Sequence, residues 1–344
     1  MRQSYLSKVI FTVLLSFIAI NSCDRAFPPE NQLNKLRILA IRANPPWLYE
    51  GESAVIDALV YSGNQEVTYS WSWCPLRGGL DNGYQCSVTP EQFKANLEKV
   101  GSANGVDDYS LGSAETVTFN YISDASTLYS LCFPIKDLLA GNLADFIKSL
   151  SCNAWGFPIS NELTVTAGGK SVTAHKDVTL LLFQQQNLNH NPSLDNLRIG
   201  PPGSPEAEAK EVPAGPSTMT LNYLQSYEMF AEMPANVTEV IYTQAPSNIT
   251  ATVNVGYNTP SGITAPVINQ YETLRLSWFV EAGYTEDITT SYNPLSDQNL
   301  TQHNLWNLPS PSKSSPDEAN IYIVIRDNRG GVDWLRRSVF LQNP

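Results

Sequence analysis

The sequence predicts a mainly β chain that folds into two β-sandwiches, and three observations carry this prediction. Residues 67–74 alternate strictly between two faces, with Trp71 and Trp73 on the apolar face. Other short apolar runs are separated by proline and glycine turns, as strands of a sandwich are. The run Leu36-Arg37-Ile38 returns as Leu197-Arg198-Ile199, which suggests two copies of one architecture.

The first predicted sandwich covers residues 35–183. It opens with strands at 36–41 and 54–61, and it closes with a hairpin at 163–182 around a Gly-Gly turn. Between about 75 and 158 the strand pattern is interrupted. We therefore expect the first sandwich to carry an insertion in this region.

The predicted insertion is partly helical. Thr89-Pro90-Glu91-Gln92 forms a capping box with proline at the first helical position. Phe93, Leu97 and Val100 follow at spacings of four and three, which predicts one buried face of a short helix. A second helical stretch is expected over 137–150.

The second predicted sandwich covers residues 197–344, after a linker at 184–196 that is rich in Gln and Asn. The whole chain is too long for one ordinary sandwich, and its length suits two domains. Strands are expected at 217–223, 239–242, 251–255, 273–280, 321–325 and 332–341. The last two flank the turn-rich loop Asp327-Asn328-Arg329-Gly330-Gly331.

These patterns resemble known extracytoplasmic modules. The opening series of strand, proline turn, strand and tryptophan-bearing strand resembles bacterial immunoglobulin-like sandwiches, although the antibody-type pair of inter-sheet cysteines is missing. The closing hairpin resembles that of PKD-like and cadherin-like modules. The resemblance implies two immunoglobulin-like β-sandwiches and says nothing about a ligand.

The N-terminus has the three-part order of an export signal over residues 1–22. Arg2 and Lys8 give a positive start, and the apolar run 9–20 is shorter than the roughly 20 residues that cross a bilayer as a helix. Ile20, Ser22 and Cys23 resemble the lipobox of bacterial lipoproteins, while Asn21 departs from its usual small apolar residue. The resemblance implies a diacylglycerol thioether (a palmitate-type anchor) on Cys23, with residues 23–34 as a lipidated tether.

The five cysteines support this interpretation of Cys23. An exported protein with an odd number of cysteines carries one leftover thiol, and acylation of Cys23 removes it. The alternative is ordinary secretory cleavage, with Cys23 as a plain thiol or disulfide partner. The remaining four pair best as neighbours in sequence, because such bridges close small loops: Cys74–Cys86 and Cys132–Cys152. Zinc is disfavoured by the absence of a CxxC pair and by an oxidising compartment.

Composition and motifs argue against several function classes. The net charge of −12 disfavours nucleic acid as a partner, since phosphate binding needs clustered Lys and Arg. The three histidines are scattered, and neither an HExxH motif nor a GxSxG elbow occurs. We therefore predict a protein that is not an enzyme and uses no cofactor. A glycan-acting hydrolase, or an accessory of one, survives only if the insertion hides a carboxylate pair.

Loop residues supply the candidate binding sites. Calcium is weakly suggested by Asp327, Asn328 and Asp333, although Asp and Asn also simply favour turns. Aromatic residues in irregular segments could stack on sugars or contact a partner. The candidate ligand-contacting residues are Trp155, Trp306, Tyr284 and Tyr292.

The sequence thus predicts a lipoprotein of the bacterial cell envelope, held to a membrane through acylated Cys23. Its expected role is non-catalytic binding or adhesion through the sandwiches, with an envelope protein or a glycan as the partner. The alternative is a structural or assembly component of the envelope. Accessibility to protease in intact cells, compared with lysed cells, separates a surface from a periplasmic location.

Overall fold

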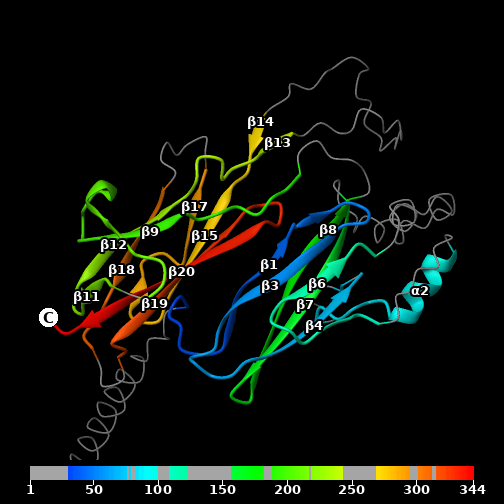
Figure 1. Cartoon of the computed structure of the whole chain (residues 1–344), viewed down its shortest axis with the longest axis horizontal. Helices are drawn as coiled ribbons and strands as arrows, with labels where there is room; N and C mark the ends of the chain where they lie inside the picture. Colours follow the sequence, from blue (N-terminus) through cyan, green and yellow to red (C-terminus); the bar gives the residue numbers. More distant parts are fainter. Residues whose placement is uncertain are drawn as a thin grey trace, which may run out of the picture.

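The structure is a computed structural model. It describes residues 30–75, 77–78, 83–99, 108–122, 156–181, 188–216, 218–242, 269–293, 301–311 and 315–344. Within these ranges β-strands predominate (Figure 1). Several predicted features lie outside the described residues: the export signal, Cys23, Cys132, Cys152, Trp155, the helix at 137–150 and the strand at 251–255.

The first sandwich has two sheets. One has the order β1-β3-β6 and the other the order β2-β8-β7-β4-β5, in which the short β2 runs parallel to β8. The strands are β1 (Arg37–Asn44), β2 (Trp47–Leu48), β3 (Ser53–Tyr61), β4 (Thr68–Cys74), β5 (Ser110–Gly112), β6 (Val117–Asn120), β7 (Gly156–Ala167) and β8 (Lys170–Leu181).

The second sandwich also has two sheets, of order β10-β9-β12-β18-β16 and β11-β20-β19-β15-β17, with β11 parallel to β20. A separate pair joins β13 (Val240–Tyr242) to β14 (Asn269–Tyr271). The other strands are β9 (Asn196–Gly200), β10 (Lys210–Glu211), β11 (Thr220–Asn222), β12 (Ser226–Glu232), β15 (Leu274–Val280), β16 (Tyr284–Thr285), β17 (Thr289–Tyr292), β18 (Thr301–Asn307), β19 (Glu318–Arg326) and β20 (Val332–Gln342).

The two sandwiches repeat one strand order. The series β1-β3-β6 corresponds to β9-β12-β18, and β2-β8-β7-β4-β5 corresponds to β11-β20-β19-β15-β17. In both, the chain enters in one sheet and then crosses to lie parallel to the last strand of the other, and the sheet pairing is that of an immunoglobulin-like sandwich. The predicted fold class, mainly β with two such sandwiches, is confirmed.

Each sandwich has its own apolar core, built on a buried tryptophan. Trp71 and Trp73 point into the first core, as the alternation over 67–74 predicts. Trp278 on β15, the strand that corresponds to β4, points into the second. Burial of such side chains, worth about 25 cal/mol per Å² of apolar surface, is what holds each pair of sheets together.

The predicted insertion differs from the structure. The boundaries of about 75–158 enclose β5 and β6, which are strands of the sandwich itself, and the start of β7. The sequence analysis missed β6 because its apolar residues are only two, Val117 and Phe119, in a strand of four residues. In the described ranges the elements added to the sandwich, among them α2, come before residue 110.

The predicted helix is α2 (Pro90–Lys99), and its capping box is confirmed. The amide of Gln92 donates to Thr89 Oγ1 at 3.3 Å, and the amide of Thr89 donates to Gln92 Oε1 at 3.0 Å. Phe93 is buried and meets Trp73 edge to face. The helix is thereby fixed to the first core.

The structure contains the disulfide Cys74–Cys86 that the sequence analysis preferred. Cys74 ends β4 with its side chain on the face opposite Trp73, so the bridge lies on the outer face of the sheet. Arg77 and Cys86 form a β-bridge, and Gly78 N donates to Gln85 O. The disulfide therefore fastens a small hairpin, the Arg77–Cys86 hairpin, over this face.

The sandwiches lie side by side, so that β1 and β3 of one are close to β19 and β20 of the other (Figure 1). A third apolar cluster fills the space between them. We call the surface where they meet the junction. Its buried apolar residues are Leu33, Leu39, Ala40, Tyr322, Val324 and Val332, with Leu59, Tyr61, Phe279 and Trp334 packed around them.

The C-terminal end of the predicted tether, 23–34, is not a free spacer. Gln32 forms a parallel bridge with Val280, and the amide of Leu33 donates to Val280 O at 2.8 Å. Asn31 is buried, and its side-chain Nδ2 donates to Thr285 O at 3.0 Å. Before it enters the first sandwich, the chain is therefore paired with the second.

Candidate functional site: the junction between the sandwiches

The loop between β19 and β20 enters the junction. Asp327 Oδ1 accepts hydrogen bonds from the amides of Arg329 and Gly331, each at 2.7 Å, which closes a tight turn. Gly330 has a φ of 101°, a conformation that favours glycine. A Cβ on Gly331 would lie 2.8 Å from the carbonyl oxygen of His190. The Gly-Gly pair is thus required by the close fit of this loop.

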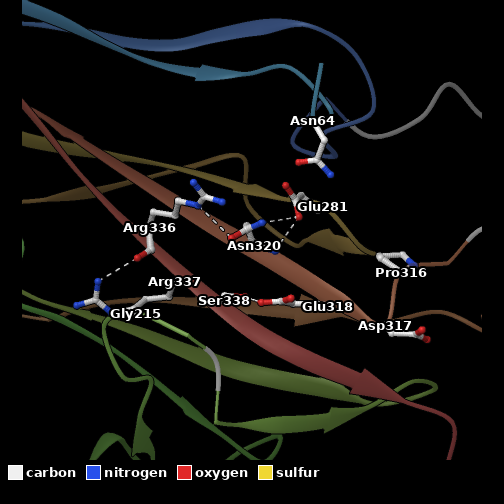
Figure 2. A pocket seen from close by; sticks show the side chains of 10 residues that line it. All are labelled: Asn64, Gly215, Glu281, Pro316, Asp317, Glu318, Asn320, Arg336, Arg337 and Ser338. Carbon is white, nitrogen blue, oxygen red and sulfur yellow. Dashed lines mark hydrogen bonds between the residues drawn. The ribbon is translucent and has the colours of Figure 1, made fainter. Parts of the chain in front are cut away.

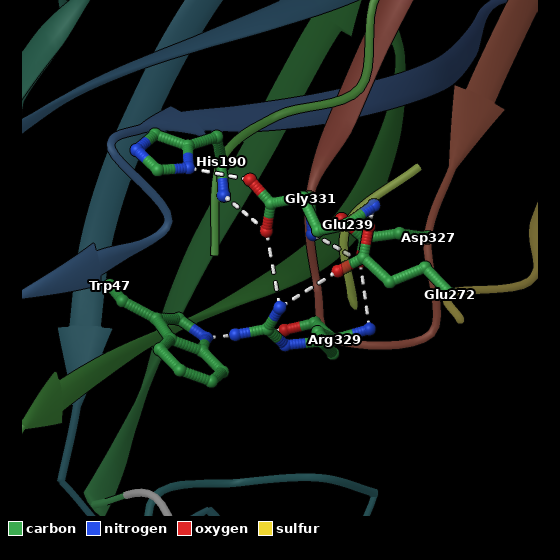
Figure 3. Close-up of polar contacts among 7 residues, drawn as sticks. All are labelled: Trp47, His190, Glu239, Glu272, Asp327, Arg329 and Gly331. Atoms are coloured by element: carbon green, nitrogen blue, oxygen red, sulfur yellow. Dashed lines mark hydrogen bonds and ion pairs between the residues drawn. The ribbon is translucent and has the colours of Figure 1, made fainter. Parts of the chain in front are cut away.

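Arg329 is the centre of a buried polar cluster (Figure 3). Its Nη1 donates to Glu239 at 3.1 Å and to Glu272 at 3.0 Å. Its guanidinium lies over the ring of Trp47 at 4.4 Å, and Trp47 Nε1 donates to Arg329 O at 3.3 Å. Because Trp47 belongs to the first sandwich and both glutamates to the second, Arg329 connects the two.

Lys176 on β8 reaches the same loop from the first sandwich, and its ammonium donates to Gly330 O. Only 8% of the residue is exposed. Burial lowers the pKa of Lys176 to about 8, and the carboxylates of Asp327 and Asp177 only partly offset this.

Glu272 is 1% exposed and lies between Arg329 and the backbone of Glu239. Burial raises the pKa of Glu272 to about 7, and the negative charge of Asp327 adds to the rise. The exposed imidazole of His190 contacts Glu239 at 2.5 Å. The cluster therefore holds an acid and a base, Glu272 and Lys176, that both titrate near neutral pH.

A second ion-pair group stands beside the apolar cluster of the junction. Arg42 on β1 contacts Asp57 at 2.7 Å within its own sandwich and Asp333 of β20 at 2.5 Å. It also lies 4.3 Å from the ring centre of Trp334. Arg326 donates to Leu39 O at 2.7 Å. These ion pairs and hydrogen bonds thus help to set how the β1–β3 sheet of the first sandwich lies against the β19–β20 sheet of the second.

A polar groove with a volume of 620 Å³ opens at another edge of the junction. Figure 2 shows Asn64, from the turn between β3 and β4, across the groove from Glu281. The other walls come from the second sandwich. They are formed by Gly215, Pro316, Asp317, Glu318, Asn320, Arg336, Arg337 and Ser338.

Arg336 is the most available cation of this groove. Its Nε donates to Asn320 Oδ1 at 3.0 Å, and its guanidinium lies 5.6 Å from the ring centre of Tyr322. No salt bridge holds it in the described part of the chain. Arg337, in contrast, is used by the protein, since it donates to Val212 O at 3.0 Å.

Glu281 anchors the floor of the groove. Its carboxylate accepts from the amide and side chain of Asn320 at 2.9 and 2.8 Å, and from Tyr322 OH at 3.2 Å. Asn320 is thereby held in place to orient Arg336. The groove offers the cation Arg336, carboxylates and hydroxyls, which suit a polar ligand. It has little apolar surface to bind a hydrophobic one.

Two of the aromatic candidates are wrong as ligand contacts. Trp306 is fully buried in the second core, where its Nε1 donates to Ala282 O at 2.8 Å, and Tyr292 is only 2% exposed. Both lie on strands, β18 and β17, that the sequence analysis treated as irregular. Tyr284 is 42% exposed at the short edge strand β16 and stays a candidate.

The weak calcium candidates are also used otherwise. Asp327 accepts from the amides of its own loop, and Asp333 is paired with Arg42. Asn328 lies between them in the same loop. No group of three or more His, Cys, Asp or Glu side chains in the described ranges is arranged to hold a metal ion. Both aspartates are therefore engaged in contacts within the protein.

Arg329, Glu272 and Lys176 were not predicted as site residues, because a single charged residue in a loop or a strand carries no motif. One signal was present: the pair Gly330-Gly331 next to Asp327 and Arg329 combines a tight turn with opposite charges. A turn of that kind that must also fit against another surface needs small residues.

Comparisons with known proteins identify no family. No protein-family model matches the chain, and no curated protein matches it. Among solved structures, a chimeric titin Z1Z2 matches at 9% identity and a TM-score of 0.18, and the match covers 90% of this chain and 100% of the titin chain. Murine CEACAM1b matches at 9% identity and a TM-score of 0.19, and the match covers 90% of this chain and 100% of the CEACAM1b chain. The Yersinia pseudotuberculosis adhesin InvE matches 91%, with 61% of that chain covered, at 9% and 0.18.

The fold assignment therefore depends on the strand order of the two sandwiches themselves. Among the residues that the structure describes, no helix is long and apolar enough to cross a bilayer.

Proposed function

We propose that the protein is a membrane-anchored lipoprotein of the bacterial envelope that binds a polar ligand without catalysis, in the groove beside the junction. The observation that carries the proposal is the groove itself, with Arg336 held against the ring of Tyr322 by its hydrogen bond to Asn320 and without a salt bridge to any described residue. Its volume of 620 Å³ falls within the range of about 300–1,000 Å³ of small-molecule sites.

The groove is suited to binding because its shape is fixed. One wall comes from the first sandwich and the rest from the second, and the junction holds the two through apolar contacts, ion pairs and hydrogen bonds. A ligand that enters a preformed groove loses less of its binding free energy to ordering the protein. Mixed charges along the walls favour a glycan or a polar peptide segment of an envelope protein.

Membrane attachment is supported by the N-terminal sequence and by where the chain enters the fold. Asn31, which is buried against the second sandwich, is eight residues along the chain from Cys23. A fully extended chain of that length spans at most about 29 Å. An acylated Cys23 would therefore hold the junction close to the membrane surface.

Replacement of Cys23 with alanine tests the anchor. We expect Cys23→Ala to lose acylation and to move from the membrane to the soluble fraction, measured by fractionation and by incorporation of labelled palmitate. Cys86→Ala, which removes a different cysteine, should remain acylated. Membrane retention and acylation of Cys23→Ala would refute the anchor and leave the groove untouched as a proposal.

Charge reversal at Arg336 tests the groove. Binding of the purified protein is measured on arrays of bacterial glycans and of envelope-protein peptides. We expect Arg336→Glu to weaken the wild-type signals at least tenfold, because it places a carboxylate where ligand acceptors would lie. Lys170→Glu, the same reversal at a lysine that does not line the groove, is the matched control.

The outcomes separate the proposed role from the alternative of an envelope assembly component. Ligand signals that are equal in wild type, Arg336→Glu and Lys170→Glu would contradict a role for the groove. Co-purification with an envelope complex that persists in Arg336→Glu would favour the assembly role, in which sheet edges make the contacts. Protease digestion of intact and lysed cells then shows which face of the membrane carries the sandwiches.

A further inference from the structure

A second cavity lies in the first sandwich and shares no lining residue with the groove. It has a volume of 250 Å³ and is enclosed between the outer face of β4, β7 and β8 and the Arg77–Cys86 hairpin. Ser72, Ser160, Glu162 and His175 line it from the sheet. The hairpin closes it with Arg77, Tyr84, Gln85 and the disulfide, and Trp73 and Tyr109 line one end.

The strand register places the polar side chains of the sheet together. Ser72 lies opposite Glu162, and Glu162 lies opposite His175, so the three form a row across β4, β7 and β8. Ser160 is two residues from Glu162 on the same face of β7. The disulfide holds the hairpin over this row, and Arg77 and His175 are close enough to interact electrostatically.

These side chains are not used to satisfy one another. In the described part of the chain the one contact among them is the pair His175–Glu162, at 3.7 Å. Ser160 is only 5% exposed, yet its hydroxyl has no hydrogen-bond partner. Buried polar groups in folded proteins are almost always paired, and an unpaired hydroxyl costs about 1–3 kcal/mol. A cavity lined in this way has hydrogen-bonding capacity to offer to a ligand.

Charge and size restrict the class of ligand. Arg77 and Glu162 have opposite charges, so the lining has no strong preference for an ion of either sign. The lining includes a donor, Arg77, an acceptor, Glu162, and serine hydroxyls that can do both, which suits the hydroxyl groups of a sugar. The volume equals about eight water molecules at 30 Å³ each, which is close to the size of one sugar ring with its hydroxyls.

We infer that the cavity under the Arg77–Cys86 hairpin binds a single neutral sugar residue. The Glu162 carboxylate accepts from its hydroxyls, the two serine hydroxyls can each donate and accept, and Arg77 donates from the hairpin. Tyr84, which also lines the cavity, lies 5.0 Å from the Arg77 guanidinium and 6.2 Å from the His175 ring. This site is independent of the groove at the junction.

Titration of the purified protein with glucose, galactose and N-acetylglucosamine tests the inference. Calorimetry measures the affinity. We expect saturable binding of at least one sugar, with a Kd of about 1–10 mM as suits a ligand of this size. Glu162→Gln and Arg77→Gln should each weaken it at least tenfold, while Glu66→Gln, an exposed glutamate outside the cavity, should not.

Three outcomes would overturn the inference. The first is no saturable binding of any of the three sugars up to about 100 mM, a concentration well above the expected Kd. The second is sugar binding that is unchanged in both Glu162→Gln and Arg77→Gln. The third is saturable binding of glycine in place of the sugars, which would assign the opposite charges to a zwitterion. Circular dichroism and melting temperature confirm that each variant is folded.

Discussion

Replacement of Arg329 with methionine is expected to lower the free energy of unfolding by about 3–5 kcal/mol. The substitution keeps much of the volume of the side chain but leaves Glu239 and Glu272 without their shared cation, close to Asp327. A buried charge that loses its partner retains the full cost of its lost hydration. The contact with Trp47 is lost as well. Urea unfolding followed by tryptophan fluorescence measures the change.

Two further variants make this expectation specific to the buried cluster. Arg336→Met, at an exposed arginine with one side-chain hydrogen bond, should change stability by less than about 1 kcal/mol. The double variant Arg329→Met with Glu272→Gln should recover part of the loss, because it removes one of the uncompensated charges. Equal stability of Arg329→Met and the wild type would show that the cluster does not bind the sandwiches together.

The stability of the protein is expected to fall as the pH rises from about 4.5 to about 7. The pKa of Glu272 is raised from 4.5 to about 7, so the folded state binds its proton more tightly than the unfolded state does. The stabilisation is complete below pH 4.5 and is lost as the pH passes through 7. A shift of this size corresponds to about 3 kcal/mol.

Lys176 has the opposite effect at higher pH. Its pKa is lowered from 10.5 to about 8, so the folded state releases the proton first and stability rises between pH 8 and 10.5. These two groups together give a minimum of stability near pH 7–8. Urea unfolding across this pH range should show the minimum of stability in the wild type. The fall of stability between pH 4.5 and 7 should disappear in Glu272→Gln. The exposed control Glu66→Gln should keep the wild-type profile. A flat profile in the wild type would contradict the burial of this cluster.

The strands that could be predicted are those with strong local patterns. The alternation around Trp71, the Gly168-Gly169 hairpin and the run 274–280 all become strands where they were expected. β12 and β18 were missed, because Glu228, Glu232, Gln302 and His303 break up their apolar pattern. Trp306 shows the consequence: an aromatic residue in an unrecognised strand was interpreted as a surface contact.

The junction could not be predicted, because its physics is not local. Arg42 and Asp333 are 291 residues apart, and Lys176 and Gly330 are 154 apart. Nothing in the neighbourhood of either partner indicates the other. The apolar outer face of β1 and β3 was not predicted either. Leu39, Leu59 and Tyr61 indicate a contact surface only once it is known that both faces of this sheet are covered.

The pairing of residues 31–33 with the end of β15 changes how the protein would bear a mechanical load. In tandem domains that are linked end to end, a pull on one terminus passes through each domain in turn. Here a pull at the N-terminal end first meets Val280 and Thr285 of the second sandwich, and the hydrogen bonds to β15 are loaded before β1 is. While these hydrogen bonds hold, a pull between this end and the C-terminal strand β20 would pass through the second sandwich and leave the first outside the path of the force.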